Sequence, residues 1–115
     1  MCGIAGIIDF SNKPIDRTIV ESMSVAMVQR GPDDHGLEIF PYAVLAHRRL
    51  SIIDLSSRGK QPMCDQNKEN WIVYNGEIYN HEELRQKLHN YNFKYFSHSD
   101  TETILNGYKI YGNKI

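Results

Sequence analysis

The chain begins MCGIAGIIDF, residues 1–10, and this stretch decides the first element of the fold. Ile4 to Phe10 is an apolar run too short for a typical helix, so we expect a β-strand buried on both faces. The run has no basic flank and soon meets Asp9, unlike a secretory signal. Position 2 is Cys2, where N-myristoylation would need glycine. These features predict a cytoplasmic protein.

Helices and strands alternate irregularly after this first strand. Apolar residues recur at helical spacing from Ile15 to Met27, and Gly31-Pro32 ends that pattern. We expect strands at 37–40, 43–50 and 71–74, a short strand at 93–96, and helices at 80–89 and 99–108. The last two helices each open on a capping-box pattern, Asn80 with Glu83 and Ser99 with Glu102. Such mixed runs predict an α+β fold with an antiparallel sheet.

Composition excludes several classes of protein. The 115 residues carry a formal net charge of −1, so no basic surface suggests a nucleic-acid partner. No apolar run is long enough to span a membrane. The two cysteines give no disulfide framework, and the five histidines lack the spacing of a zinc site, so we expect no metal. No phosphate-binding glycine loop is present. We therefore expect one small globular domain over residues 1–115.

Cys2 is the first candidate for chemistry. If Met1 is removed, the thiol and a free α-amine lie on one residue, and the amine has an ordinary pKa of about 7.7 to 8.0. The residue would then carry its own base, as N-terminal nucleophiles do. Alternatively, Cys2 is a small apolar residue that opens a strand.

Asn75-Gly76 follows the expected strand at 71–74 and allows two interpretations. Both residues tolerate a positive φ, so the pair fits a type I′ hairpin turn. It also fits an oxyanion hole, in which the Asn75 amide and the Gly76 N–H stabilise a tetrahedral intermediate.

Charged residues at two other places have a structural and a functional interpretation. His47-Arg48-Arg49 lies where the strand at 43–50 would meet water, but one guanidinium could instead bind a carboxylate through two hydrogen bonds. Asp100 lies in a helix N-terminus, which favours carboxylates, and it could also bind a ligand ammonium.

Five segments together resemble one family. They are MCGIAGI at 1–7, RGPDD at 30–34, LAHRRLSIIDLS at 45–56, YNGEIYNHEELR at 74–85 and SDTETIL at 99–105. In this order they resemble the N-terminal glutaminase domain of glutamine-hydrolysing asparagine synthetases, which are class II glutamine amidotransferases with an N-terminal nucleophile. RGPDD points to the asparagine synthetase branch of that class.

The resemblance implies a role for each site residue. Cys2 would attack the glutamine carboxamide and form a thioester, which water then hydrolyses. Arg49, rather than Arg48, would bind the substrate α-carboxylate. The remaining implied residues are Asn75 and Gly76 for the oxyanion, Leu50, Ser51, Ile52 and Ile53 for backbone contacts to the substrate, and Glu77 and Asp100 for the α-ammonium.

The resemblance also implies a larger architecture than 115 residues provide. The family folds as stacked antiparallel sheets between helical layers, so this chain would be a partial glutaminase domain. We expect no synthetase domain in these 115 residues, and therefore not the part for which ATP and Mg²⁺ are expected; for the glutaminase itself we expect no cofactor. The unfinished sheet edge predicts self-association. The function expected is glutamine hydrolysis, with an inert module that binds an amino acid or a protein as the alternative.

Overall fold

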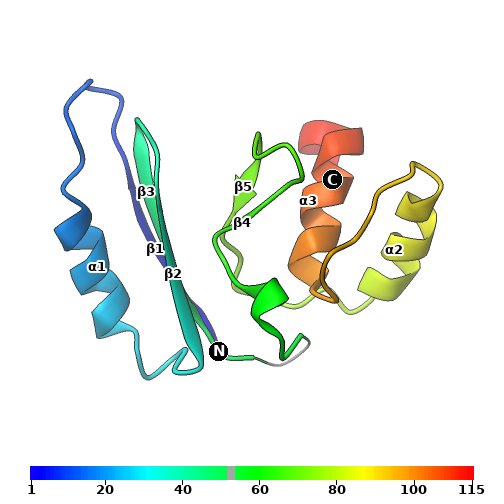
Figure 1. Cartoon of the computed structure of the whole chain (residues 1–115), viewed down its shortest axis with the longest axis horizontal. Coiled ribbons are helices and arrows are strands. Elements are labelled where there is room, and N and C mark those ends of the chain that lie inside the picture. The colour runs from blue at the N-terminus through cyan, green and yellow to red at the C-terminus, as the bar shows by residue number, and fades with distance from the viewer. Residues whose placement is uncertain (52–53) are drawn as a thin grey trace. The chain divides into compact units, whose positions relative to one another are not determined.

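The computed structural model describes residues 1–51 and 54–115, which form two compact units (Figure 1). The first unit comprises Met1–Ser51, Lys60–Pro62 and Val73–Gly76. The second comprises residues 54–59, Met63–Ile72 and Glu77–Ile115. Each unit contains at least one α-helix and an antiparallel sheet, so the α+β class is confirmed.

The first unit is a three-stranded antiparallel sheet with one helix against it. Its strands are β1 (Gly3–Ile8), β2 (Asp34–Ile39) and β3 (Ala43–Arg49), in the order β1-β3-β2. Helix α1 (Arg17–Ala26) covers one face of this sheet (Figure 1). Its core consists of Val20 of α1 with Val44 and Ala46 of β3, all fully buried. Because side chains alternate along a strand, the residues paired with these two on β1 and β2 line the same face.

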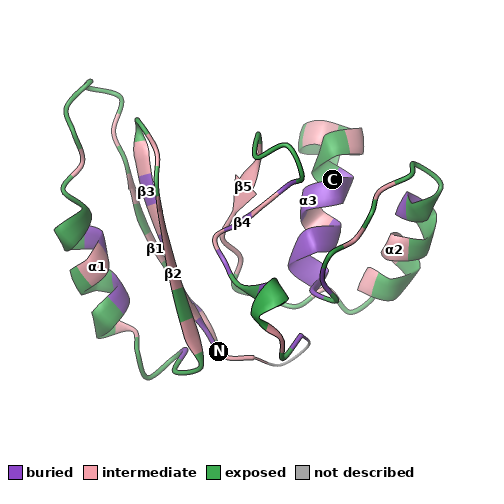
Figure 2. Ribbon diagram, in the orientation of Figure 1, coloured by how far each residue is buried: buried purple, intermediate pink, exposed green. Residues whose placement is uncertain are grey.

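The prediction that the first strand is buried on both faces is wrong. Ala5 and Ile7 pack against the core, whereas Ile4 and Ile8 are 46% and 64% exposed. Burial alternates along β1 after Gly3, and Figure 2 shows buried, half-buried and exposed stretches mixed along the strands of this sheet. An apolar run indicates a strand, but it does not show whether a second layer covers the other face. In the first unit, α1 covers only one.

Helix α1 and the hairpin agree with the sequence patterns. Asp16 caps α1, because its carboxylate accepts hydrogen bonds from the Thr18 N–H and hydroxyl group. The helix ends at Ala26, and a turn leads to Arg30 before Gly31-Pro32. Strands β2 and β3 form a hairpin on either side of Pro41-Tyr42, near the positions expected for strands at 37–40 and 43–50.

The second unit contains two further helices and a short sheet. Strands β4 (Met63–Cys64) and β5 (Trp71–Ile72) pair antiparallel. Helices α2 (His81–His89) and α3 (Asp100–Tyr111) pack together, and short 3₁₀ turns occupy Ser57–Gly59 and Gly112–Lys114. Leu88 of α2 and Leu105 of α3 are both buried. No helix within residues 1–51 and 54–115 is long and apolar enough to cross a membrane.

Of two strand predictions in this region, one was too long and the other was wrong, for a shared reason. The strand expected at 71–74 ends at Ile72, because side chains bond the Tyr74 backbone on both sides. The strand expected at 93–96 does not form, because the Phe96 N–H donates to the Glu102 carboxylate over 2.9 Å. In both segments, side chains replace the strand partner that the backbone would need.

The two predicted capping boxes differ from the observed caps. Ser99 caps α3, accepting from the Thr101 N–H, but Glu102 bonds to Phe96 and Ser97 rather than to the Ser99 N–H. Asn80 precedes α2 without a side-chain cap bond. The pattern therefore located both helix starts and misassigned the side-chain bonds.

Candidate active site

Cys2 lies beside the end of β3. Its Sγ accepts from the Leu50 N–H at 3.3 Å and contacts the Leu50 carbonyl oxygen at 3.6 Å. The register of β1 with β3, carried one residue past Gly3, sets Cys2 opposite Arg49. The thiol of the half-buried Cys2 is thus adjacent to two residues predicted to meet substrate, Arg49 and Leu50.

Arg48 and Arg49 have different environments. The Nε of Arg48 donates to the Ser24 hydroxyl and carbonyl oxygens of α1, at 3.0 and 3.1 Å. Because successive strand residues point to opposite faces, Arg49 is directed away from α1. Arg49 is only 7% exposed and lies opposite Asp34 of β2. The choice of Arg49 over Arg48 as the carboxylate-binding residue is consistent with this arrangement.

The Arg30–Asp34 segment supports the same corner of the sheet. Arg30 Nε donates to the Cys2 carbonyl oxygen at 3.3 Å. The Asp33 carboxylate accepts from the Ser51 N–H at 2.7 Å, and the Asp33 N–H donates to the Arg49 carbonyl oxygen at 3.0 Å. Sequence reasoning treated this segment as a helix stop and a turn, and it missed these bonds. They fix the backbone on both sides of Leu50.

A glycine makes that close approach possible. A Cβ on Gly31 would lie 2.4 to 2.5 Å from backbone atoms of Arg48 and Arg49, closer than real Cβ atoms come. The segment after α1 can therefore lie against the end of β3 only with glycine at this position.

Asn75 and Gly76 do not form the hairpin turn that the sequence also allowed. Neither residue of the pair has the positive φ that a type I′ turn requires. The pair lies between β5 and α2, and both residues are exposed. A Cβ on Gly76 would lie 2.5 Å from Tyr74 Oη, so the tyrosine ring folds back beside the glycine.

His47 is a buried residue next to this segment, and sequence reasoning assigned it no role apart from its place before Arg48 and Arg49. It is 1% exposed, and its Nε2 lies 3.2 Å from the Tyr74 carbonyl oxygen. The pKa of His47 is lowered, mainly because the side chain is buried. The hydrogen bond to the Tyr74 carbonyl oxygen raises the pKa, but the positive charge of Arg49 lowers it further. The imidazole is therefore neutral at pH 7, and Nε2 carries the proton because a carbonyl oxygen can only accept.

Two predicted site residues belong to the second unit. The boundary between the units falls between Gly76 and Glu77. Asp100, 5% exposed, accepts from the Ile78 N–H at 2.9 Å and so holds the residue that follows Glu77. Glu77 itself is exposed. Ile52 and Ile53, predicted to contact substrate, lie outside the described residues.

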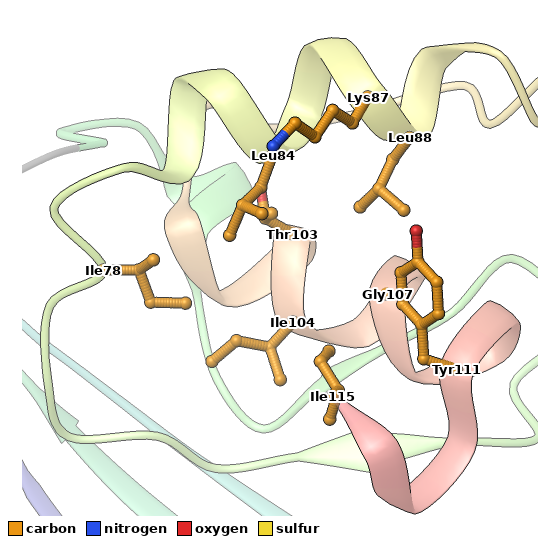
Figure 3. Close-up of a pocket in the computed structure, with 9 residues that line it drawn as sticks. All are labelled: Ile78, Leu84, Lys87, Leu88, Thr103, Ile104, Gly107, Tyr111 and Ile115. Atoms are coloured by element: carbon orange, nitrogen blue, oxygen red, sulfur yellow. The ribbon is translucent and has the colours of Figure 1, made fainter.

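An apolar groove in the second unit is separate from the predicted site residues. It lies between α2 and α3, with Ile115 at one side (Figure 3). Leu84, Leu88 and Ile104 contribute to its lining. Among the residues that the structure describes, no group of three or more His, Cys, Asp or Glu side chains could hold a metal ion.

Comparison with known proteins identifies similar sequences over the whole chain. A family model described as a glutamine amidotransferase domain matches residues 1–115. Asparagine synthetase [glutamine-hydrolyzing] 1 of Bacillus subtilis is 37% identical over 96% of this chain. The protein of that name from Arabidopsis thaliana is 42% identical over 97% of the chain. A putative asparagine synthetase of Methanocaldococcus jannaschii is also 42% identical, over 97%. The chain spans only 18%, 19% and 24% of the lengths of these three relatives.

Proposed function

Because this chain belongs to the family of glutamine amidotransferase domains, we propose that it hydrolyses glutamine to glutamate and ammonia through a thioester at Cys2. The observation that carries this proposal is the position of the Cys2 thiol. Its Sγ accepts a hydrogen bond from the Leu50 N–H, just past the end of β3. In the register of β1 with β3, Cys2 lies opposite Arg49. An N-terminal-nucleophile fold of stacked sheets is part of the proposal, and the sheet with its one open face is compatible with it.

The chemistry requires that Met1 be removed. The α-amine of Cys2 would then accept the thiol proton, and the thiolate would attack the side-chain carbonyl carbon of glutamine. An S–C bond forms, the C–N bond breaks, and the protonated amine returns its proton to the departing ammonia. Water then cleaves the thioester, giving glutamate and regenerating the thiol. The reaction needs no redox partner or metal to balance.

The tetrahedral intermediate carries a negative oxygen that needs hydrogen-bond donors. We assign the Asn75 side-chain amide and the Gly76 N–H to this task. The absence of a hairpin turn at these residues removes the competing structural explanation for the pair. Donors of this kind lower the barrier because they are oriented before charge develops.

The amino-acid end of glutamine carries one charge of each sign. We assign its α-carboxylate to Arg49, since Arg48 is engaged with Ser24. Leu50 and Ser51 would add backbone contacts, and Asp33 fixes their position. Glu77 and Asp100 would receive the α-ammonium.

The acceptor of the ammonia follows from the names of the relatives. We propose that the protein supplies ammonia for amidation of a carboxylate, with aspartate as the first candidate because the relatives are named asparagine synthetases. Activation of that carboxylate would require ATP and Mg²⁺. That step would belong to a synthetase domain, corresponding to the part of the relatives that this chain does not match.

The proposal is tested by measuring ammonia release from glutamine by the protein with Met1 removed. The Cys2→Ala variant should lose at least ~10³-fold in kcat, because the covalent route is gone. Cys64→Ala is the matched control, since Cys64 lies in β4 of the second unit and should leave turnover unchanged. Turnover by Cys2→Ala at the wild-type rate would refute the proposal.

A further inference from the structure

Two buried polar side chains of the first unit have no part in the chemistry above. His47 of β3 is 1% exposed and Gln61 is 6% exposed. Both bond to the backbone of one residue. His47 Nε2 donates to the Tyr74 carbonyl oxygen at 3.2 Å, and Gln61 Oε1 accepts from the Tyr74 N–H at 2.6 Å. We call His47, Gln61 and the Tyr74 backbone the Tyr74 clamp.

The sheet provides the room for this clamp. His47 lies opposite Gly36 of β2, on the face away from α1. A Cβ on Gly36 would lie 2.1 Å from the Gln61 carbonyl oxygen and 3.1 Å from Pro62 Cδ. Because Gly36 has no side chain, residues 60–62 pack directly on the sheet beside His47. From there the Gln61 side chain reaches Tyr74.

The clamp acts on the segment that contains the proposed oxyanion donors. The Tyr74 carbonyl group and the Asn75 N–H belong to one planar peptide unit. A bond that fixes the carbonyl oxygen therefore also fixes the positions of the Asn75 N and Cα atoms, from which its side chain extends. Asn75 and Gly76 are both exposed, so burial does not hold either residue in place.

We propose that His47 and Gln61 are positioning residues for glutamine hydrolysis, holding Asn75 and Gly76 in the orientation that stabilises the oxyanion. This proposal rests on the proposed function. Neither side chain needs to touch the substrate. Their effect is to fix the Tyr74–Asn75 peptide unit on the sheet that also carries Cys2 and Arg49.

The protonation of His47 supports a role beyond packing. With the proton on Nε2, its Nδ1 is an acceptor, and it is buried without a hydrogen-bond partner among the described residues. An unpaired buried acceptor is unfavourable, and an apolar side chain of similar size would avoid it. Retaining histidine is explained if the bond from Nε2 to Tyr74 is needed.

Substitution of His47 tests the clamp in the intact protein with Met1 removed. His47→Leu removes the donor and should lower kcat by about 10- to 100-fold, with the KM for glutamine changed less than about threefold. His47→Gln places an amide N–H near the position of Nε2 and should restore kcat to within about threefold of wild type. Val44→Ala, on the other face of β3, controls for lost stability and should leave kcat unchanged. Equal kcat values for His47→Leu and Val44→Ala would overturn the proposal.

Hydrogen exchange gives a second result that does not depend on activity. The Tyr74 amide, which donates to Gln61, should exchange at least ~10-fold faster in His47→Leu than in wild type, and at an unchanged rate in Val44→Ala once global stability is matched. Unchanged exchange in His47→Leu would show that the clamp does not hold this segment. If wild-type protein fails to hydrolyse glutamine, the proposed function is wrong and the exchange result still decides the structural part. If wild type is active and His47→Leu keeps its kcat, only the clamp is wrong.

Discussion

Arg48 donates from Nε to the Ser24 hydroxyl and carbonyl oxygens, at 3.0 and 3.1 Å, which joins β3 to α1. The next residue, Arg49, alternates to the opposite face of the sheet, where it lies opposite Asp34. Two adjacent arginines therefore have separate tasks, one in the fold and one at the proposed site.

Substituting each arginine by lysine should separate these tasks. Arg49→Lys keeps the charge but loses the two-pronged hydrogen bonding to a carboxylate, so we expect the KM for glutamine to rise at least ~10-fold with a smaller change in kcat. Arg48→Lys should leave KM unchanged and lower the free energy of unfolding by about 1 to 2 kcal/mol. Steady-state kinetics and urea denaturation measure both. A larger rise in KM for Arg48→Lys would reverse the assignment.

Gly31 should be intolerant of any side chain. Gly31→Ala places a Cβ 2.4 to 2.5 Å from the Arg48–Arg49 backbone, so the chain must shift, and we expect a loss of at least ~2 kcal/mol in stability together with weaker glutamine binding. Gly112→Ala is the matched control. Gly112 has φ of 57° and ψ of −134° but open space around its Cβ position, so the expected loss is backbone strain of about 1 to 3 kcal/mol, with binding unchanged. Thermal denaturation and glutamine titration compare the two. Glutamine binding by Gly31→Ala as tight as that by Gly112→Ala would contradict the packing argument.

Asp100 accepts a hydrogen bond from the Ile78 N–H and is also proposed to bind the substrate α-ammonium. One substitution separates these two roles. Asp100→Asn can still accept from the Ile78 N–H, so the fold should lose less than about 1 kcal/mol. The variant lacks the negative charge, so the KM for glutamine should rise at least ~10-fold. Urea denaturation and glutamine kinetics test the two parts separately. An unchanged KM would remove Asp100 from the substrate site and leave it as a structural residue.

Stability should fall in acid because of a buried carboxylate outside the site. Burial raises the pKa of Asp65, but bonds from the Asn70 side chain, the Glu69 and Asn70 N–H groups and Lys109 outweigh it and hold the pKa at about 2. A depressed carboxylate pKa stabilises the fold above the unfolded pKa of about 3.9, and this is lost as pH falls toward 2. We expect the free energy of unfolding to fall by about 1 to 2 kcal/mol when Asp65 is protonated, allowing for screening by solvent. Urea denaturation from pH 6 to pH 2 should show this slope in wild type and a weaker one in Asp65→Asn.

The sequence patterns located the main elements but not the contacts between them. Helical spacing from Ile15 to Met27 predicted α1 correctly, because local periodicity decides such a helix, whereas the cap at Asp16 was not predicted. The pattern could not show that Glu102 bonds to Phe96 and Ser97, since that bond needs the loop before α3 in place.

For the proposed site, the sequence suggested residue types but not the bonds that support them. The resemblance implied roles for Cys2 and Arg49, and their adjacency follows from the register of β1 with β3. His47 and Gln61 were missed because their significance depends on a shared partner, the Tyr74 backbone, which is far from both in sequence. A histidine in an otherwise apolar strand was the one available signal.

Covalent labelling tests the central claim, that Cys2 is the nucleophile for glutamine hydrolysis. The protein with Met1 removed is treated with the glutamine analogue 6-diazo-5-oxo-norleucine, and the modified peptide is located by mass spectrometry. We predict one adduct, on Cys2, with Cys64 unmodified and with glutamine slowing the labelling. An adduct on Cys64 alone, or continued glutamine hydrolysis after full labelling of Cys2, would contradict the account.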